Sequence, residues 1–77
     1  MDKDLPKQLQ RMCVNNNIGT SMVLAHVGLN RSNFRRWLEG EACPSEKSLL
    51  KLRVGVLFVE YIARANEIFQ VQKASGI

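Results

Sequence analysis

The stretch that decides the fold runs from Gly28 to Pro44 and reads GLNRSNFRRWLEGEACP. Gly28 is suited to end one short helix, and Asn30 is suited to cap the next. On the 3.6-residue helical period, the second helix, residues 30–38, turns three apolar side chains into the core, namely Phe34, Trp37 and Leu38. Its outer face then presents the polar and basic residues Arg31, Ser32, Asn33, Arg35 and Arg36. The stretch therefore predicts two short helices joined by a tight turn.

A short helix with an aromatic underside and an arginine-rich outer face has the proportions needed to enter the major groove of DNA. In that groove an arginine can bond a guanine edge through two hydrogen bonds, and Asn or Ser can add smaller contacts. The alternative interpretation is that the charged residues only form a solvated face. The cap, the turn glycine and the closing loop from Gly40 to Pro44 would then all be coincidental, so we favour DNA binding.

The length and composition predict one small domain. The chain has 77 residues, is 45% hydrophobic and contains only 2 cysteines, so it is neither disordered nor held by disulfides. A core of this size is only just sufficient for stability, and we expect oligomerisation to add to it. The formal net charge of +4 favours a polyanionic partner.

The charge is unevenly distributed along the chain. Residues 1–53 hold nine Lys or Arg against five Asp or Glu, whereas residues 54–77 hold two of each and are largely apolar. This asymmetry suggests a nucleic-acid surface followed by a packing or partner surface. Within a single domain spanning 1–77, we expect a DNA-binding bundle at 4–53 and an apolar dimerisation segment at 54–77.

No arrangement of residues predicts a metal site, a cofactor site or a catalytic centre. Cys13 and Cys43 stand apart, with His26 as their one candidate companion, whereas a zinc site needs about four ligands at short spacings. We expect both cysteines to be buried free thiols in a reducing compartment. His26 is the single histidine, without a Ser/Asp or paired-carboxylate arrangement, so we expect a surface residue and a protein that is not an enzyme.

No segment predicts a membrane or secretory location. The first four residues form no apolar run, and the longest apolar stretch, Val54 to Val59, is too short to span a bilayer. We therefore expect a cytoplasmic protein without a membrane partner.

Two further helices are expected before the turn. Residues 4–15 predict the first, with Asp4 as a possible cap and Pro6 in the first turn. The second covers Met22 to Val27 and is capped by Thr20 or Ser21. Its inward side chains are expected to be Met22, Val23, Leu24 and Val27.

The chain after Pro44 predicts a long apolar helix. Ser45 is suited to cap it, and Glu46 is favourable at its positive end. The β-branched residues from Val54 to Val59 could instead form a short strand, but the length and the polar strip along one side favour a helix. A helix that is apolar nearly all round needs cover on more than one side, which we expect a second copy to supply. The expected dimerisation residues are Leu57, Phe58, Tyr61, Ile62, Ala65, Ile68 and Phe69.

The stretch from Thr20 to Pro44 resembles the helix-turn-helix of the lambda-repressor-like, Cro-type regulators of phages and bacterial operons. The matching residues are Val23, Val27, Gly28, Leu29, Asn30, Phe34, Trp37, Gly40 and Pro44. The resemblance implies an all-α fold, a small four- to five-helix bundle with a central helix-turn-helix and an apolar C-terminal dimerisation helix. This chain has Leu24 where the family usually has alanine, so either the two helices lie further apart or the second helix is rotated.

The resemblance also implies a function and a set of contacts with DNA. It implies a sequence-specific transcriptional regulator that binds a palindromic operator as a homodimer, with residues 30–38 in the major groove. The base-reading residues are then Arg31, Ser32 and Arg36, with Asn33 or Arg35 as alternatives. The phosphate contacts are Thr20, Ser21, Asn30 and Lys47. Repression and activation both stay open, as does a contact with RNA polymerase or a regulatory protein.

A protein-interaction module, such as an antirepressor or an antitoxin, is the alternative function. It would keep the helix-turn-helix scaffold and use the apolar C-terminal segment as its partner surface. Glu39 and Glu41 lie close to the expected DNA-binding helix and would repel phosphates unless they point away or bond a cytosine amine. We interpret them as surface residues that temper non-specific binding.

Overall fold

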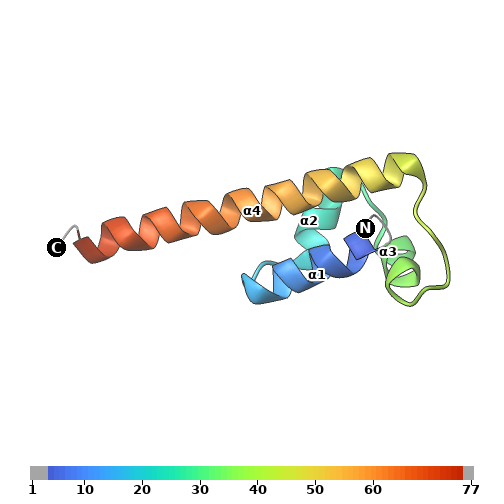
Figure 1. The fold of residues 1–77 in the computed structure, drawn as a ribbon, viewed down its shortest axis with the longest axis horizontal. Coiled ribbons are helices and arrows are strands. Elements are labelled where there is room, and N and C mark those ends of the chain that lie inside the picture. The colour runs from blue at the N-terminus through green and yellow to red at the C-terminus, as the bar shows by residue number, and fades with distance from the viewer. Residues whose placement is uncertain (1–3, 76–77) are drawn as a thin grey trace.

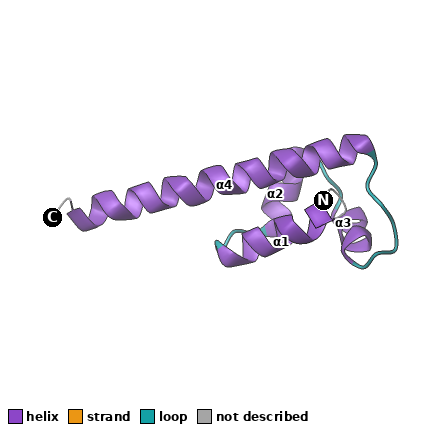
Figure 2. Ribbon diagram, in the orientation of Figure 1, coloured by secondary structure: helices purple, strands orange, loops and turns teal. Residues whose placement is uncertain are grey.

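The protein is a four-helix structure in this computed structural model, which describes the backbone of residues 4–75 and the side chains of residues 4–68 (Figure 1). The helices are α1 (Leu5–Asn15), α2 (Thr20–Val27), α3 (Arg31–Leu38) and α4 (Glu46–Ser75). No strand occurs in the described part of the chain, so the expected all-α class is confirmed (Figure 2). The strand alternative for residues 54–59 is wrong, because α4 passes through them without a break.

The core lies where α1 and α2 pack against the N-terminal half of α4, with α3 held against α1 (Figure 1). Its buried side chains are Leu5, Leu9, Cys13, Val23, Leu24, Phe34, Leu52, Val56 and Val59. Gly55 is also buried, and a Cβ atom there would lie 3.3 Å from Cδ2 of Leu9 and 3.4 Å from Cγ1 of Val23. The absence of a side chain at Gly55 therefore lets α4 approach both neighbouring helices closely.

Two of the expected N-terminal caps are wrong. The side chain of Asp4 makes no capping hydrogen bond to α1. Helix α2 starts at Thr20, so Gly19 is its cap residue, and no side chain caps it. The helix starts this early because the carbonyl oxygen of Gly19 already accepts hydrogen bonds from the backbone N–H groups of Met22, at 3.1 Å, and Val23, at 3.3 Å.

The other expected helix ends are confirmed. Gly28 ends α2 in the left-handed conformation at φ 79°, which an L side chain resists. Oδ1 of Asn30 accepts hydrogen bonds from the backbone N–H groups of Ser32 and Asn33 and so caps α3. Oγ of Ser45 accepts a hydrogen bond from the N–H of Ser48 at the start of α4. These caps fix where α3 and α4 begin.

Two burial expectations are wrong, those for Met22 and Cys43. Met22 is 51% exposed, because α2 packs through Val23 and Leu24, and Met22 lies about 100° round the helix from Val23. The expectation is met in part for Val27, Trp37 and Leu38, which are half-buried. Trp37 and Leu38 pack against the core and line an apolar hollow beside Pro44. Both cysteines are free thiols as expected, but Cys43 is exposed in the loop before α4.

Helix α4 continues well beyond the bundle, toward the C-terminal end of the molecule (Figure 1). The molecule measures 51 by 23 by 19 Å, and the 30 residues of α4 span about 45 Å at 1.5 Å per residue. None of the described helices is both long and apolar enough to cross a lipid bilayer. Five large apolar residues of α4 are between 55% and 73% exposed: Leu50, Val54, Leu57, Tyr61 and Ile68.

Candidate functional site

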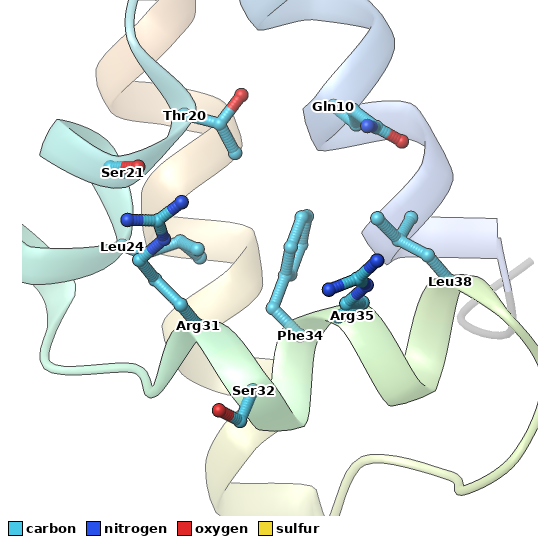
Figure 3. Close-up of a pocket in the computed structure, with 9 residues that line it drawn as sticks. All are labelled: Gln10, Thr20, Ser21, Leu24, Arg31, Ser32, Phe34, Arg35 and Leu38. Carbon is cyan, nitrogen blue, oxygen red and sulfur yellow. The ribbon is translucent and has the colours of Figure 1, made fainter.

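A hollow of about 560 Å³ opens between α1, α2 and α3 (Figure 3). Its rim is polar and basic, and its floor contains the buried Phe34. The lining residues are Gln10, Thr20, Ser21, Leu24, Arg31, Ser32, Phe34, Arg35 and Leu38. Three helices that are separate in the chain therefore bring their polar side chains to one surface.

Arg31 and Arg35 stand on either side of Phe34 in the hollow (Figure 3). They occupy the first and fifth positions of α3, so they lie about one turn apart on the same side of the helix. Phe34 is buried between α3 and the rest of the bundle and packs edge-on against Trp37, with ring centroids 6.4 Å apart. The apolar side of α3 thus anchors the helix while both guanidinium groups stay exposed.

The N-terminus of α2 forms the opposite wall of the hollow, where Thr20 and Ser21 lie. The first N–H groups of a helix have no partner within it, and they mark the positive end of the helix dipole. No acidic residue lies in the first turn of α2. Arg31 of α3 lies beside this positive helix end, an arrangement that attracts anions (Figure 3).

The hollow gathers five of the predicted contact residues and leaves four outside it. Those that line it are Thr20, Ser21, Arg31, Ser32 and Arg35. Ser32 lies at its edge, with the hydroxyl directed away from Phe34 (Figure 3). The four outside are Asn30, Asn33, Arg36 and Lys47. Arg36 is exposed on α3, whereas Lys47 is exposed on α4, and the side-chain oxygen of Asn30 is occupied by its capping bonds.

Arg35 forms an ion pair that the sequence analysis did not predict. Its Nε atom lies 3.5 Å from Oε1 of Glu39, one helical turn further along, and both side chains are exposed. Among the described residues, Arg31 and Arg36 form no such pair. The pairing partly neutralises Arg35, whereas Arg31 and Arg36 face no carboxylate within the described part of the chain.

Gln10 is a candidate functional residue that sequence reasoning missed. It lies on α1, next to the buried Leu9, and its amide reaches the rim of the hollow opposite α3 (Figure 3). The α1 sequence shows only that Gln10 lies off the apolar stripe. The crossing of α1 with α3, which brings it to the site, is a tertiary property that periodicity does not reveal.

Thr20 lines the hollow, and its side chain also forms a hydrogen bond with the buried Cys13. Burial raises the pKa of the Cys13 thiol, and a side-chain hydrogen bond with Thr20 lowers it by a smaller amount. Thr20 is half-buried, whereas its neighbour Ser21 is exposed. Ser21 is therefore the more accessible hydroxyl at the start of α2.

The predicted dimerisation residues divide between the two sides of α4. Leu57, Tyr61, Ala65 and Ile68 are exposed, whereas Phe58 and Ile62 are half-buried on the flank nearer the bundle. The ring of Phe58 stacks on the exposed His26 with centroids 4.6 Å apart and planes 13° apart, a contact that the sequence did not predict. The side chain of Phe69 lies outside the described residues.

Comparisons with models of known protein families, with curated proteins and with solved structures found no match to this chain. Among the described residues, no three His, Cys, Asp or Glu side chains come together as a candidate metal site. The residues and the geometry of the chain itself therefore carry the assignment of function.

Proposed function

We propose that the protein is a sequence-specific, double-stranded DNA-binding transcriptional regulator that acts as a homodimer on a palindromic operator. Helices α2 and α3 form its helix-turn-helix, in the manner of the lambda-repressor-like, Cro-type regulators that the sequence resembles. Helix α3 enters the major groove, and the start of α2 approaches the phosphate backbone.

The observation that carries the proposal is the division of α3 into two sides. Phe34 is buried and anchors the helix, while Arg31, Ser32 and Arg36 are exposed at its first, second and sixth positions. The cap provided by Asn30 holds the first turn of α3 in place. A helix fixed in this way holds the backbone of these arginines in place, and their exposed guanidinium groups are free to form bidentate bonds to guanine.

The wall of the hollow supplies the phosphate contacts in this proposal. Ser21 is exposed at the N-terminus of α2, where a phosphate would meet free N–H groups and a positive dipole end. Arg31 lies on the facing wall and adds a full positive charge. Phosphate contacts fix the position of the protein on the duplex, and base contacts select the sequence.

The Arg35–Glu39 pair limits what Arg35 contributes. Its guanidinium would have to leave a carboxylate before it bound a base, which lowers the gain from that contact. In the proposal, Arg31 and Arg36 therefore read bases. The pairing of Arg35 with Glu39 reduces the non-specific attraction of α3 to phosphate. This assigns to Glu39 the role that we expected for the acidic residues near α3.

A protein-interaction module is the second candidate function, and the exposed apolar side of α4 favours it. Such a module would bind another protein through the exposed apolar side of α4. Arg31 and Arg36 would then give it no affinity for DNA. Duplex binding separates the two functions directly.

The experiment is a titration of a labelled random-sequence duplex with the protein at several salt concentrations. If phosphates are neutralised, the logarithm of the affinity falls linearly with the logarithm of the salt concentration, with a slope of about −0.9 per charged contact. Lys47→Ala, which removes a predicted phosphate contact, is expected to make this slope shallower by about one contact. Arg11→Ala, which removes the same charge from α1 outside the hollow, is the matched control and should leave the slope unchanged. No measurable duplex binding at low salt would contradict the proposal.

A further inference from the structure

Helix α4 has two apolar sides that lie opposite one another. The side formed by Leu52, Gly55, Val56 and Val59 is buried against α1 and α2. At about 100° per residue, the opposite side carries the exposed stripe. The stripe consists of Leu50, Val54, Leu57, Tyr61, Arg64 and Ile68, and all six side chains are exposed. A second helix can therefore lie along the stripe without meeting the rest of the bundle.

The spacing of the stripe is that of a coiled coil. Its members follow one another at intervals of four, three, four, three and four residues, which is the alternation of positions a and d in a heptad repeat. From Leu50 to Ile68 the stripe is about 27 Å long at 1.5 Å per residue. The stripe is therefore a seam of five large apolar residues and one arginine.

The occupant that fits this seam is a second copy of the same helix. A heptad stripe is complementary to another heptad stripe, because each a or d side chain fits between four residues of the facing helix. A two-fold dimer uses the same surface on both copies, so one chain supplies both halves of the interface.

Arg64 distinguishes the two directions in which the copies can pair. In a parallel two-fold pair each residue faces its own copy, so the two Arg64 side chains would meet within the seam, where like charges repel. In an antiparallel pair, position a faces position d, and the two arginines lie apart. One register pairs all six residues of the stripe with the stripe of the other copy. In it, Leu50 lies opposite Ile68 of the other copy, and Leu57 lies opposite Tyr61 of the other copy. Arg64 then faces Val54, which its aliphatic stem can cover while its charged end reaches water.

We propose that two copies of the chain pair through the exposed stripes of α4 as an antiparallel coiled coil, with Leu50 of each copy opposite Ile68 of the other. The choice of a second copy agrees with the homodimer of the proposed function and rests on it in part. The antiparallel direction is inferred from the position of Arg64 within the stripe, and the pairing surface is inferred from the exposed apolar side of α4. Pairing is tested without DNA, so its failure and the failure of DNA binding can be told apart.

The first test is sedimentation of the wild-type chain and of two charge variants. Tyr61→Glu places a carboxylate at the middle of the stripe, and we expect it to weaken the dimer at least tenfold. Asn66→Glu adds the same charge to an exposed position on the other side of α4 and should leave the dimer unchanged. A wild-type protein that is monomeric at every concentration, or a Tyr61→Glu dimer as stable as the control, would overturn the pairing.

The second test measures direction by disulfide cross-linking, and it does not depend on how Tyr61→Glu folds. Leu50→Cys and Ile68→Cys are made separately in a Cys43→Ser background, because Cys43 is an exposed thiol. After dimers of the two variants are mixed and allowed to exchange, we expect the cross-link to join one chain of each kind. Each variant alone should stay uncross-linked, since antiparallel pairing separates like positions by about 27 Å. Efficient cross-linking of Ile68→Cys to itself would overturn the antiparallel direction.

Discussion

Cδ2 of Leu9, on α1, lies 3.3 Å from where a Cβ atom on Gly55, on α4, would stand. The contact is made in the fully buried centre of the core, since Leu9 has no exposed surface and Val23 closes the other side. Glycine weakens a helix interior by about 1 kcal/mol relative to alanine. At this position, close packing offsets that cost.

Gly55→Ala is expected to destabilise the protein by up to about 2 kcal/mol in urea unfolding, because overpacking a filled core costs about 1–3 kcal/mol and exceeds the gain in helix propensity. The matched control is the same change in a Leu9→Ala background, where the crowding atom is absent. There we expect Gly55→Ala to stabilise the chain. Equal effects in both backgrounds would show that the helices do not approach as described.

The cap of α3 gives a second prediction about stability. Asn30→Ala removes an oxygen that accepts hydrogen bonds of 2.7 Å from Ser32 and 3.3 Å from Asn33, and it should lower the free energy of unfolding by about 0.5–2 kcal/mol. Asn30→Asp keeps an acceptor in the same place and should stay close to wild type. The measurement is chemical unfolding of the three proteins, and an alanine variant as stable as the aspartate variant would contradict the cap.

The thiol of Cys13 predicts a loss of stability at high pH. Burial holds its pKa in the folded protein above the ordinary value of 9.0, with the Thr20 hydrogen bond acting in the opposite direction as the smaller effect. The folded state then keeps a proton that the unfolded state releases, so stability falls as pH rises above the unfolded-state pKa. Between about pH 8 and about pH 10, we expect wild type to lose more stability than Cys13→Ala under reducing conditions. Parallel pH profiles would be incompatible with this account.

Local sequence patterns predicted the end of α2 and the starts of α3 and α4 well. Asn30 and Ser45 cap helices because a cap depends on only three or four neighbouring residues. Gly28 ends α2 because a left-handed residue is a local requirement. The start of α2 was predicted wrongly, since the carbonyl oxygen of Gly19 already accepts hydrogen bonds from the N–H groups of Met22 and Val23.

Burial was predicted less well, because it depends on which helices meet. Met22 is apolar and close to two core residues, yet half of its side chain is exposed because α2 packs through Val23 and Leu24. Trp37 is half-buried because α3 packs mainly against α1, which leaves part of the tryptophan beside an open hollow. Periodicity found both apolar sides of α4, but only the structure shows which one the bundle covers.

The candidate site was predicted in its residue types and only partly in its grouping. Arg31 and Ser21, which were predicted separately as a base contact and a phosphate contact, come from different helices and line one hollow. Gln10 joins them from α1, and Glu39 pairs with Arg35, neither of which the sequence predicted. Lys47 lies outside the hollow, so any phosphate it contacts would be a different one.

The proposed division of labour between base and phosphate contacts gives a prediction about affinity. Arg31→Ala and Arg36→Ala should each lower affinity for the preferred duplex by about 1–3 kcal/mol more than for a scrambled duplex. Lys47→Ala should lower both affinities in equal proportion, because a phosphate contact does not depend on the base sequence. Binding is measured for each variant on both duplexes at one fixed salt concentration. Equal losses on both duplexes for the two arginine variants would remove α3 from sequence reading.

The most direct test of the central claim, that α3 recognises a DNA sequence, is selection of bound duplexes from a random pool. We expect the wild-type protein to enrich one sequence with two-fold related halves. The Arg31→Ala, Arg36→Ala double variant should lose the preference at defined positions in each half. If wild-type protein that retains its helical content enriches no sequence over the starting pool, the claim is contradicted.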